Sequence, residues 1–295
     1  MDRIYLMELV RSRQVGKLNR RDFMKQATVV LGSTIAANTL LAACTPAAEE
    51  ELPPVVDTTI PVTEPGTTTA GDLTTGITTY TNDEGTELMG YLAYQSEADP
   101  RPAVIVLQEW WGLNDHIKDV ADRFARAGYV AFAPDLYHGQ VATEPNEARK
   151  LAMELSMPDA VAEIEAAIAY LQDQSFVSGG TGIIGFCMGG GLVLQSALNS
   201  DNIDAGAVFY GSPLSPADAR QMETPIHTFI GTADNIPVSG VEAMHAAFDE
   251  AGIDNAYQVY DGAQHAFFND TRASYDPEAA EDAWQRTLAW FKTYL

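Results

Sequence analysis

The sequence predicts an α/β fold, in which a mostly parallel central sheet is covered by helices on both faces. Three observations predict it. Short apolar runs alternate with segments of helical periodicity from residue 103 onwards, an antiparallel hairpin precedes them, and one apolar run ends at a glycine-rich turn before a helix. With 46% hydrophobic residues, the chain can bury one sizeable core, so we expect one folded domain, residues 76–295.

The domain is predicted to begin with an antiparallel hairpin. Residues 77–80 and 88–94 read as strands, and the intervening Asn82-Asp83-Glu84-Gly85 supplies a glycine turn. The following run, residues 103–107, is continuously apolar, as expected for a strand that is buried on both faces.

The rest of the domain alternates between helices and strands. Residues 114–127 carry apolar side chains at helical spacing, and Gly128 ends that helix. Further strands are expected at 129–133, 181–186, 205–210, 226–230 and 256–260, and further helices at 146–155, 159–172, 241–251 and 277–294. Such alternation predicts parallel strands, whose carboxyl ends meet at one edge of the sheet and hold the site there.

The turn around Cys187 is the strongest chemical signal. Residues 181–191 read as strand, sharp turn and helix, with Gly185 and Gly189 flanking the cysteine. A nucleophile at such a turn needs glycine on both sides, because side chains there would collide with the strand and the helix. The helix N-terminus favours a thiolate and offers the Met188 N–H to an oxyanion. The alternative is a buried structural cysteine.

Two further residues complete a nucleophile, acid and base in chain order. Asp234 follows the strand at 226–230, and His265 follows the last strand. Loops at one edge of the sheet would bring both to Cys187, where the histidine serves as base and the aspartate orients it. Taken singly, His265 also fits a solvated loop histidine and Asp234 a turn residue.

The net charge of the chain limits the classes of partner that it is expected to bind. The formal net charge is −24, and residues 1–43 hold seven Lys or Arg against three Asp or Glu. The rest of the chain therefore holds ten basic and 38 acidic side chains, a net charge of −28. Because nucleic-acid binding requires clustered cations, no nucleic-acid partner is expected.

The N-terminal segment is predicted to be an export signal, residues 1–43. Arg20 and Arg21 precede a mildly apolar segment, as in twin-arginine signals, and Leu41-Ala42-Ala43-Cys44 is similar to a lipoprotein cleavage site. The alternatives are an uncleaved anchor or a chance match. We expect lipidation at Cys44, hence attachment to a membrane and an extracytoplasmic location. Residues 44–75, rich in Thr and Pro, are expected to form a disordered tether.

Several motifs, taken together and in this order, resemble those of the dienelactone hydrolase family of α/β-hydrolases. They are Gln108-Glu109-Trp110-Trp111-Gly112, Ala133-Pro134-Asp135-Leu136-Tyr137, Gly185-Phe186-Cys187-Met188-Gly189-Gly190, Gly231-Thr232-Ala233-Asp234 and His265-Ala266-Phe267. The resemblance covers residues 77–295. It implies an α/β-hydrolase fold and a hydrolase of esters or lactones, with a Cys187-His265-Asp234 triad and no metal or cofactor.

The resemblance also implies roles for residues around the triad. Glu109 would hold the resting thiol until substrate displaces it, and the backbone N–H groups of Met188 and Trp110 would bind the oxyanion. The alternative for Glu109 is a solvated carboxylate at the pocket rim. An apolar pocket is expected from aromatic side chains, although such residues at strand ends are as often part of the core. The expected pocket residues are Trp110, Trp111, Tyr137 and Phe267, with Arg149 as the nearest cation.

The sequence departs from the family at the substrate carboxylate. Family members acting on dienelactone use arginines there, one of them four residues after the catalytic histidine, a position that Asn269 occupies here. We therefore expect neutral esters or lactones to be preferred. A thioesterase or peptidase using the same triad, and a non-catalytic ligand-binding lipoprotein, are the alternative functions.

Overall fold

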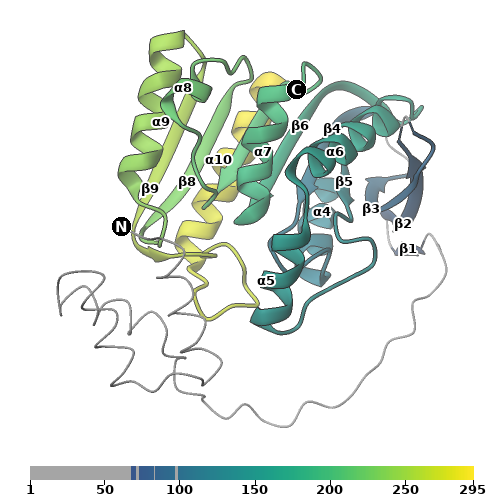
Figure 1. Cartoon of the computed structure of the whole chain (residues 1–295). Coiled ribbons are helices and arrows are strands. Elements are labelled where there is room, and N and C mark those ends of the chain that lie inside the picture. Colours follow the sequence, from purple (N-terminus) through teal and green to yellow (C-terminus); the bar gives the residue numbers. More distant parts are fainter. Residues whose placement is uncertain (1–67, 71–72, 83, 97–98) are drawn as a thin grey trace. The chain divides into compact units, whose positions relative to one another are not determined.

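The computed structural model describes residues 68–70, 73–82, 84–96 and 99–295 (Figure 1). One nine-stranded sheet has the order β1-β2-β3-β5-β4-β6-β7-β8-β9. The six strands from β5 to β9 in this order pair in parallel, whereas β1, β2 and β3 pair antiparallel and join the rest through an antiparallel β3–β5 pair. The predicted α/β-hydrolase fold with its N-terminal hairpin is therefore confirmed.

The strands and helices have the following bounds. The strands are β1 (Thr68–Ala70), β2 (Leu73–Thr81), β3 (Glu87–Gln95), β4 (Arg101–Leu107), β5 (Val130–Pro134), β6 (Val177–Phe186), β7 (Ala205–Phe209), β8 (Ile226–Ala233) and β9 (Asn255–Gln264). The helices are α4 (Asp115–Arg126), α5 (Pro145–Glu154), α6 (Met157–Gln172), α7 (Met188–Asn199), α8 (Pro216–Ala219), α9 (Val238–Ala251) and α10 (Pro277–Tyr294).

Helices cover the sheet on both faces (Figure 1). One core lies between the sheet and helices α4 and α10, and includes Phe124 and Phe291. The other lies under α6, α7 and α9, and includes Ile164 and Phe248. Strands β4 to β8 contribute to both cores, which explains why their sequences read as continuous apolar runs rather than as alternating ones.

The largest differences from the predicted elements occur at the N-terminal edge of the sheet. Strand β1 and the first residues of β2, Leu73 to Thr75, fall inside the segment that was predicted to be a disordered tether. This part of the prediction is wrong for those residues. β2 is held by main-chain pairing along its whole length with β3, and its threonines favour strands without forming an apolar pattern. Residues 44–67 lie outside the described residues.

The remaining differences are extensions at strand ends. β8 and β9 continue to Ala233 and Gln264, immediately before the predicted catalytic Asp234 and His265, and β6 begins at Val177 rather than 181. The short helix α8 was not predicted. Among the described residues, no helix is both long and apolar enough to span a membrane.

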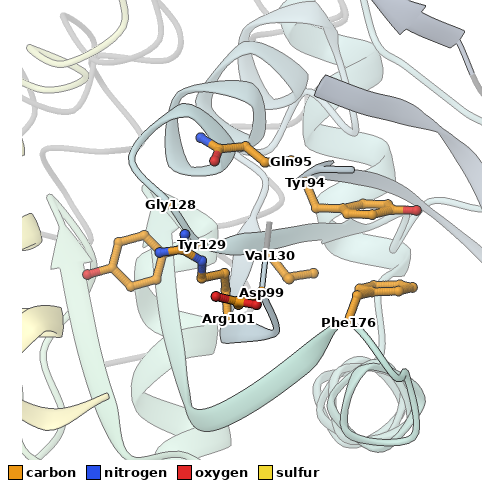
Figure 2. Close-up of a pocket in the computed structure, with 8 residues that line it drawn as sticks. All are labelled: Tyr94, Gln95, Asp99, Arg101, Gly128, Tyr129, Val130 and Phe176. Carbon is orange, nitrogen blue, oxygen red and sulfur yellow. The ribbon is translucent and has the colours of Figure 1, made fainter. Parts of the chain in front are cut away.

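A small pocket lies at the amino-terminal ends of the strands, where β4 and β5 begin (Figure 2). Its walls include the stacked rings of Tyr94 and Phe176, 4.3 Å apart, together with Arg101 and Val130. Its volume of about 10 Å³ holds no more than one water molecule. Active sites of parallel sheets lie at the carboxyl ends of the strands. This pocket lies at the opposite, amino-terminal ends, so we do not assign it to catalysis.

Candidate active site

Cys187 occupies a strained turn between β6 and α7. Its φ of 56° and ψ of −112° lie outside the strand and helix regions, and its N–H donates to the Phe209 carbonyl oxygen at 3.0 Å. A Cβ on Gly185 would lie 2.2 Å from the Gly189 carbonyl oxygen, and a Cβ on Gly189 would lie 2.6 Å from the Gln108 carbonyl oxygen. The two glycines therefore allow the turn, and the turn presents the partly exposed sulfur at the helix N-terminus.

His265 and Asp234 form a bidentate pair directly after β9 and β8. The imidazole Nδ1 lies 3.0 Å from each Asp234 carboxylate oxygen, and the Asp234 side chain is fully buried. Burial opposes protonation of His265, but hydrogen bonds and charges from Asp234 and Cys187 outweigh it and raise the pKa of His265 to about 10. Because Nδ1 faces Asp234, the second imidazole nitrogen, Nε2, is the one left for another partner.

Tyr137 contacts both residues whose backbone N–H groups are expected at the oxyanion, Trp110 and Met188. Tyr137 donates its hydroxyl both to the Trp110 carbonyl oxygen at 3.2 Å and to the Met188 sulfur at 3.4 Å. Within the described part of the chain, neither the Met188 nor the Trp110 N–H has a hydrogen-bond acceptor. Both are thus available to a developing negative charge, as an oxyanion site requires.

Glu109 is buried in the loop directly after β4, and its side chain has one hydrogen bond to the described residues. Only 2% of the residue is exposed, and Asn269 Nδ2 donates to its Oε2 at 2.8 Å. Burial raises the pKa of Glu109, while the bond from Asn269 and the nearby cations Arg272 and His265 lower it in part. Two contacts place Glu109 at this end of the sheet: its neighbour Gln108 lies against Gly189 of the turn at Cys187, and its partner Asn269 donates its backbone N–H to the carbonyl oxygen of Ala266, next to His265, at 3.0 Å.

Tyr210 and Asn269 are site residues that sequence reasoning left without a role. Tyr210 is fully buried, its φ is +40°, and its ring lies 5.1 Å from that of His265. Burial raises its pKa well above the usual value, and the charges of Glu109, Cys187 and Asp234 act in the same direction. Its hydroxyl has no partner among the described residues. Its place directly after β7 was the signal available in the sequence.

The predicted pocket residues divide into three groups. The half-buried Trp110 and Trp111 contact each other edge to face at 5.2 Å, near Tyr137. Phe267 does not line a pocket: it is 0% exposed and packs against Tyr210 in the core, and it follows Ala266, whose backbone φ of 63° changes the direction of the chain after His265. Arg149 lies on the exposed side of α5, whereas its neighbour Ala148 is the buried one.

A cation that was not predicted, Arg272, lies beside the predicted pocket residue Trp111. The guanidinium of Arg272 stacks on the Trp111 ring, 4.1 Å from its centroid, and lowers the pKa of Glu109. Within the described residues, no group of three His, Cys, Asp or Glu side chains has an arrangement suited to a metal ion.

Comparisons with known proteins agree with this geometry. The model of the dienelactone hydrolase family matches residues 88–295. The chain is 38% identical over 223 residues to protein usf of Aquifex pyrophilus, covering 72% of this chain and 95% of that protein. It is 36% identical over 244 residues to a protein from Synechocystis sp. named as a carboxymethylenebutenolidase, covering 76% and 98%.

A solved structure extends the agreement to three dimensions. A crystal structure described as a dienelactone hydrolase from Klebsiella pneumoniae superposes with a TM-score of 0.70 at 30% identity, covering 76% of this chain and all of that one. The matched region contains β3 to α10, and so includes the turn at Cys187 and the loops that carry Asp234 and His265. The chain belongs to the dienelactone hydrolase family and is a hydrolase of carboxylic esters or lactones.

Proposed function

We propose that the chain cleaves carboxylic esters or lactones through a Cys187-His265-Asp234 triad and an acyl-enzyme intermediate. The observation that carries the proposal is the bidentate His265–Asp234 pair, which holds the imidazole by Nδ1 and leaves Nε2 for the sulfur. A pKa of about 10 for His265 means that the imidazole is protonated at neutral pH and has a proton to give to the leaving group.

The proposed reaction follows from this arrangement. The Cys187 thiolate attacks the carbonyl carbon, and the resulting oxyanion accepts the N–H groups of Met188 and Trp110. The tetrahedral intermediate collapses as His265 gives its Nε2 proton to the leaving alkoxide, which leaves a thioester on Cys187. Water, deprotonated by His265, then attacks the thioester. The acid product departs, and the thiolate and imidazolium are restored.

Substrate screening tests this proposal. The purified protein, with β1 and β2 retained, would be assayed on short acyl esters, lactones, thioesters and peptides, with Cys187→Ala as the control. We expect hydrolysis of esters or lactones, and a loss of at least about 10³-fold in Cys187→Ala at unchanged thermal stability. A mass increase equal to one acyl group in wild type, but not in Cys187→Ala, would reveal the intermediate.

Other outcomes of the screen favour the alternatives. Faster cleavage of thioesters or peptides would make the chain a thioesterase or a peptidase. Retained hydrolysis in Cys187→Ala would contradict the cysteine mechanism, and Ser212, which lies just after β7, would be the next nucleophile to test. Binding of these compounds without turnover would indicate a ligand-binding role.

We also propose that the chain is exported and anchored to a membrane by lipid on Cys44. Arg20 and Arg21 before the apolar segment, and Leu41-Ala42-Ala43-Cys44 at its end, support the proposal. A diacylglycerol thioether supplies two acyl chains, enough for stable attachment at roughly 0.8 kcal/mol per buried methylene. Mass spectrometry of the membrane fraction should show a lipid-modified N-terminus at Cys44; an intact segment 1–43 with unmodified Cys44 would contradict the proposal.

A further inference from the structure

Asn269 is held between a threonine and the buried glutamate. It is 0% exposed and lies in the loop after β9, four residues beyond His265. Its Nδ2 donates to Glu109 Oε2 at 2.8 Å. Its Oδ1 accepts two hydrogen bonds from Thr271, one from the backbone N–H at 3.0 Å and one from the hydroxyl at 2.7 Å.

These contacts fix the orientation of the Asn269 amide. The backbone N–H of Thr271 can only donate, so the atom facing it must be the Asn269 carbonyl oxygen. The amide NH₂ group must then face Glu109. Since this group can only donate, Glu109 Oε2 must accept in either protonation state, and a proton on the carboxyl group resides on Oε1.

Asn269 acts on Glu109 without adding a charge. The charged groups that influence the carboxyl group are Arg272, which stacks on Trp111, and His265 of the triad, while Tyr210 is the buried hydroxyl whose pKa Glu109 raises. Both cations stabilise the ionised carboxylate, and burial opposes them. A neutral donor stabilises the carboxylate less than a guanidinium would, so Glu109 retains more of its affinity for a proton.

We propose that Asn269 is a positioning residue for Glu109: it fixes the carboxyl group beside the triad and assigns its exchangeable proton to Oε1. This inference rests on the proposed hydrolytic function, in which Glu109 would act on the reaction through the thiol of Cys187 and the imidazole of His265. Asn269, which stands where family members acting on dienelactone have an arginine, would thus determine which oxygen of Glu109 carries the proton.

Titration of Glu109 tests the inference directly. The side-chain carboxyl carbon would be followed by ¹³C NMR in glutamate-labelled protein and assigned by its disappearance in Glu109→Gln. Asn269→Leu removes the donor at similar volume, and the apparent pKa of Glu109 should rise by about one unit, since a hydrogen bond to a charged group contributes about 1.5 kcal/mol or more. The pH profile of kcat/KM should shift by the same amount.

A second variant separates charge from packing. Asn269→Asp keeps an acceptor for both Thr271 bonds but places a carboxylate beside Glu109, so the pKa of Glu109 should rise further than in Asn269→Leu. Asn269→Asp also provides the test of the inference if Asn269→Leu fails to fold. Asn202→Leu is the matched control: Asn202 donates to the Glu165 carboxylate on the surface, and its loss should leave the Glu109 titration and the pH profile unchanged.

Two results would overturn the inference. One is an unchanged Glu109 titration in folded Asn269→Leu and Asn269→Asp. The other is a rate loss for Asn269→Leu that is equally large in the Glu109→Gln background, since a residue acting through Glu109 should add little there. Neither result bears on the triad: the proposed function fails instead if Cys187→Ala retains activity.

Discussion

The surroundings of His265 and His227 shift the pKa values of the two imidazoles in opposite directions. His227 lies near the start of β8, is 6% exposed, and stacks on Phe229 at 4.3 Å and against Trp290 at 5.2 Å. Burial lowers its pKa to about 4, and the electrostatic influence of Arg286 and of the His245 imidazole acts in the same direction. At the other end of the strands, the pKa of His265 is raised to about 10.

The comparison shows that burial alone does not set the charge of a histidine here. Desolvation disfavours the imidazolium at both positions, and only His265 has a carboxylate bonded to it. The site also carries backbone strain: Cys187, Tyr210 and Ala266 have positive φ, whereas the region around His227 has regular strand geometry. The surrounding sheet maintains strain and buried charge together at the carboxyl ends of the strands.

The largest effect is expected from removing the charged histidine. His265→Ala should lower kcat/KM by about 10³-fold or more, because it removes the proton donor of the first chemical step and the base of the second. His227→Phe is the matched control and should retain full activity at pH 8, where His227 is neutral already. Equal losses in the two variants would mean that His265 acts through stability rather than through chemistry.

Asp234→Asn is expected to have the next largest effect, about 10²- to 10⁴-fold in kcat/KM. The pKa of His265 should fall, since Asp234 raises it. A raised histidine pKa stabilises the fold fully below about pH 6.5, and this contribution is lost as the pH rises through about 10. Denaturant unfolding from pH 6 to 10 should therefore show a smaller alkaline loss of stability in Asp234→Asn. An unchanged loss would contradict the pairing.

His227→Phe should change stability in acid. Because the pKa of His227 is about 4 in the fold and near 6.5 in the unfolded chain, the unfolded state binds more protons between these values. The wild-type unfolding free energy should therefore fall as the pH drops from 6.5 to 4, with about 3 kcal/mol of that fall due to His227. In denaturant titrations, the unfolding free energy of His227→Phe should not show the part of the acid-induced fall that is due to His227. Parallel curves for the two proteins would show that His227 titrates normally.

The smallest effect concerns the charge of the substrate. Asn269 replaces an arginine, Arg149 is exposed on α5, and Arg272 is stacked on Trp111. We expect kcat/KM for a neutral lactone to exceed that for its carboxylated analogue by several-fold to about tenfold, since a poorly paired buried charge is disfavoured. Assays at matched salt are needed, because screening alters the approach of an anion. A preference for the anion that disappears in Arg149→Ala or Arg272→Ala would identify that residue as the clamp.

Chain order and periodicity predicted the sheet and the positions of its loops. The apolar run before Cys187 and the strands before Asp234 and His265 were sufficient for this, because parallel strands end at one edge. Contacts across the sheet were not predictable. The bond from Asn269 to Glu109 joins residues 160 positions apart, and the burial of Phe267 depends on how the chain turns after His265. β1 and the first residues of β2, Leu73 to Gly76, were missed because main-chain pairing leaves no hydrophobic pattern.

The turn at residue 187 has a consequence for how this chain could diversify. Its backbone is fixed by glycines at 185 and 189 and by the bond from its N–H to Phe209, none of which involves the sulfur. Serine would therefore fit without rebuilding the turn, but an alkoxide forms at neutral pH far less readily than a thiolate. The choice between sulfur and oxygen is thus a choice of acidity rather than of shape. A single substitution converts one nucleophile into the other. Any further substitutions needed to restore the activity of the serine form would be in Glu109 and its neighbours, which affect protonation, and not in the backbone of the turn.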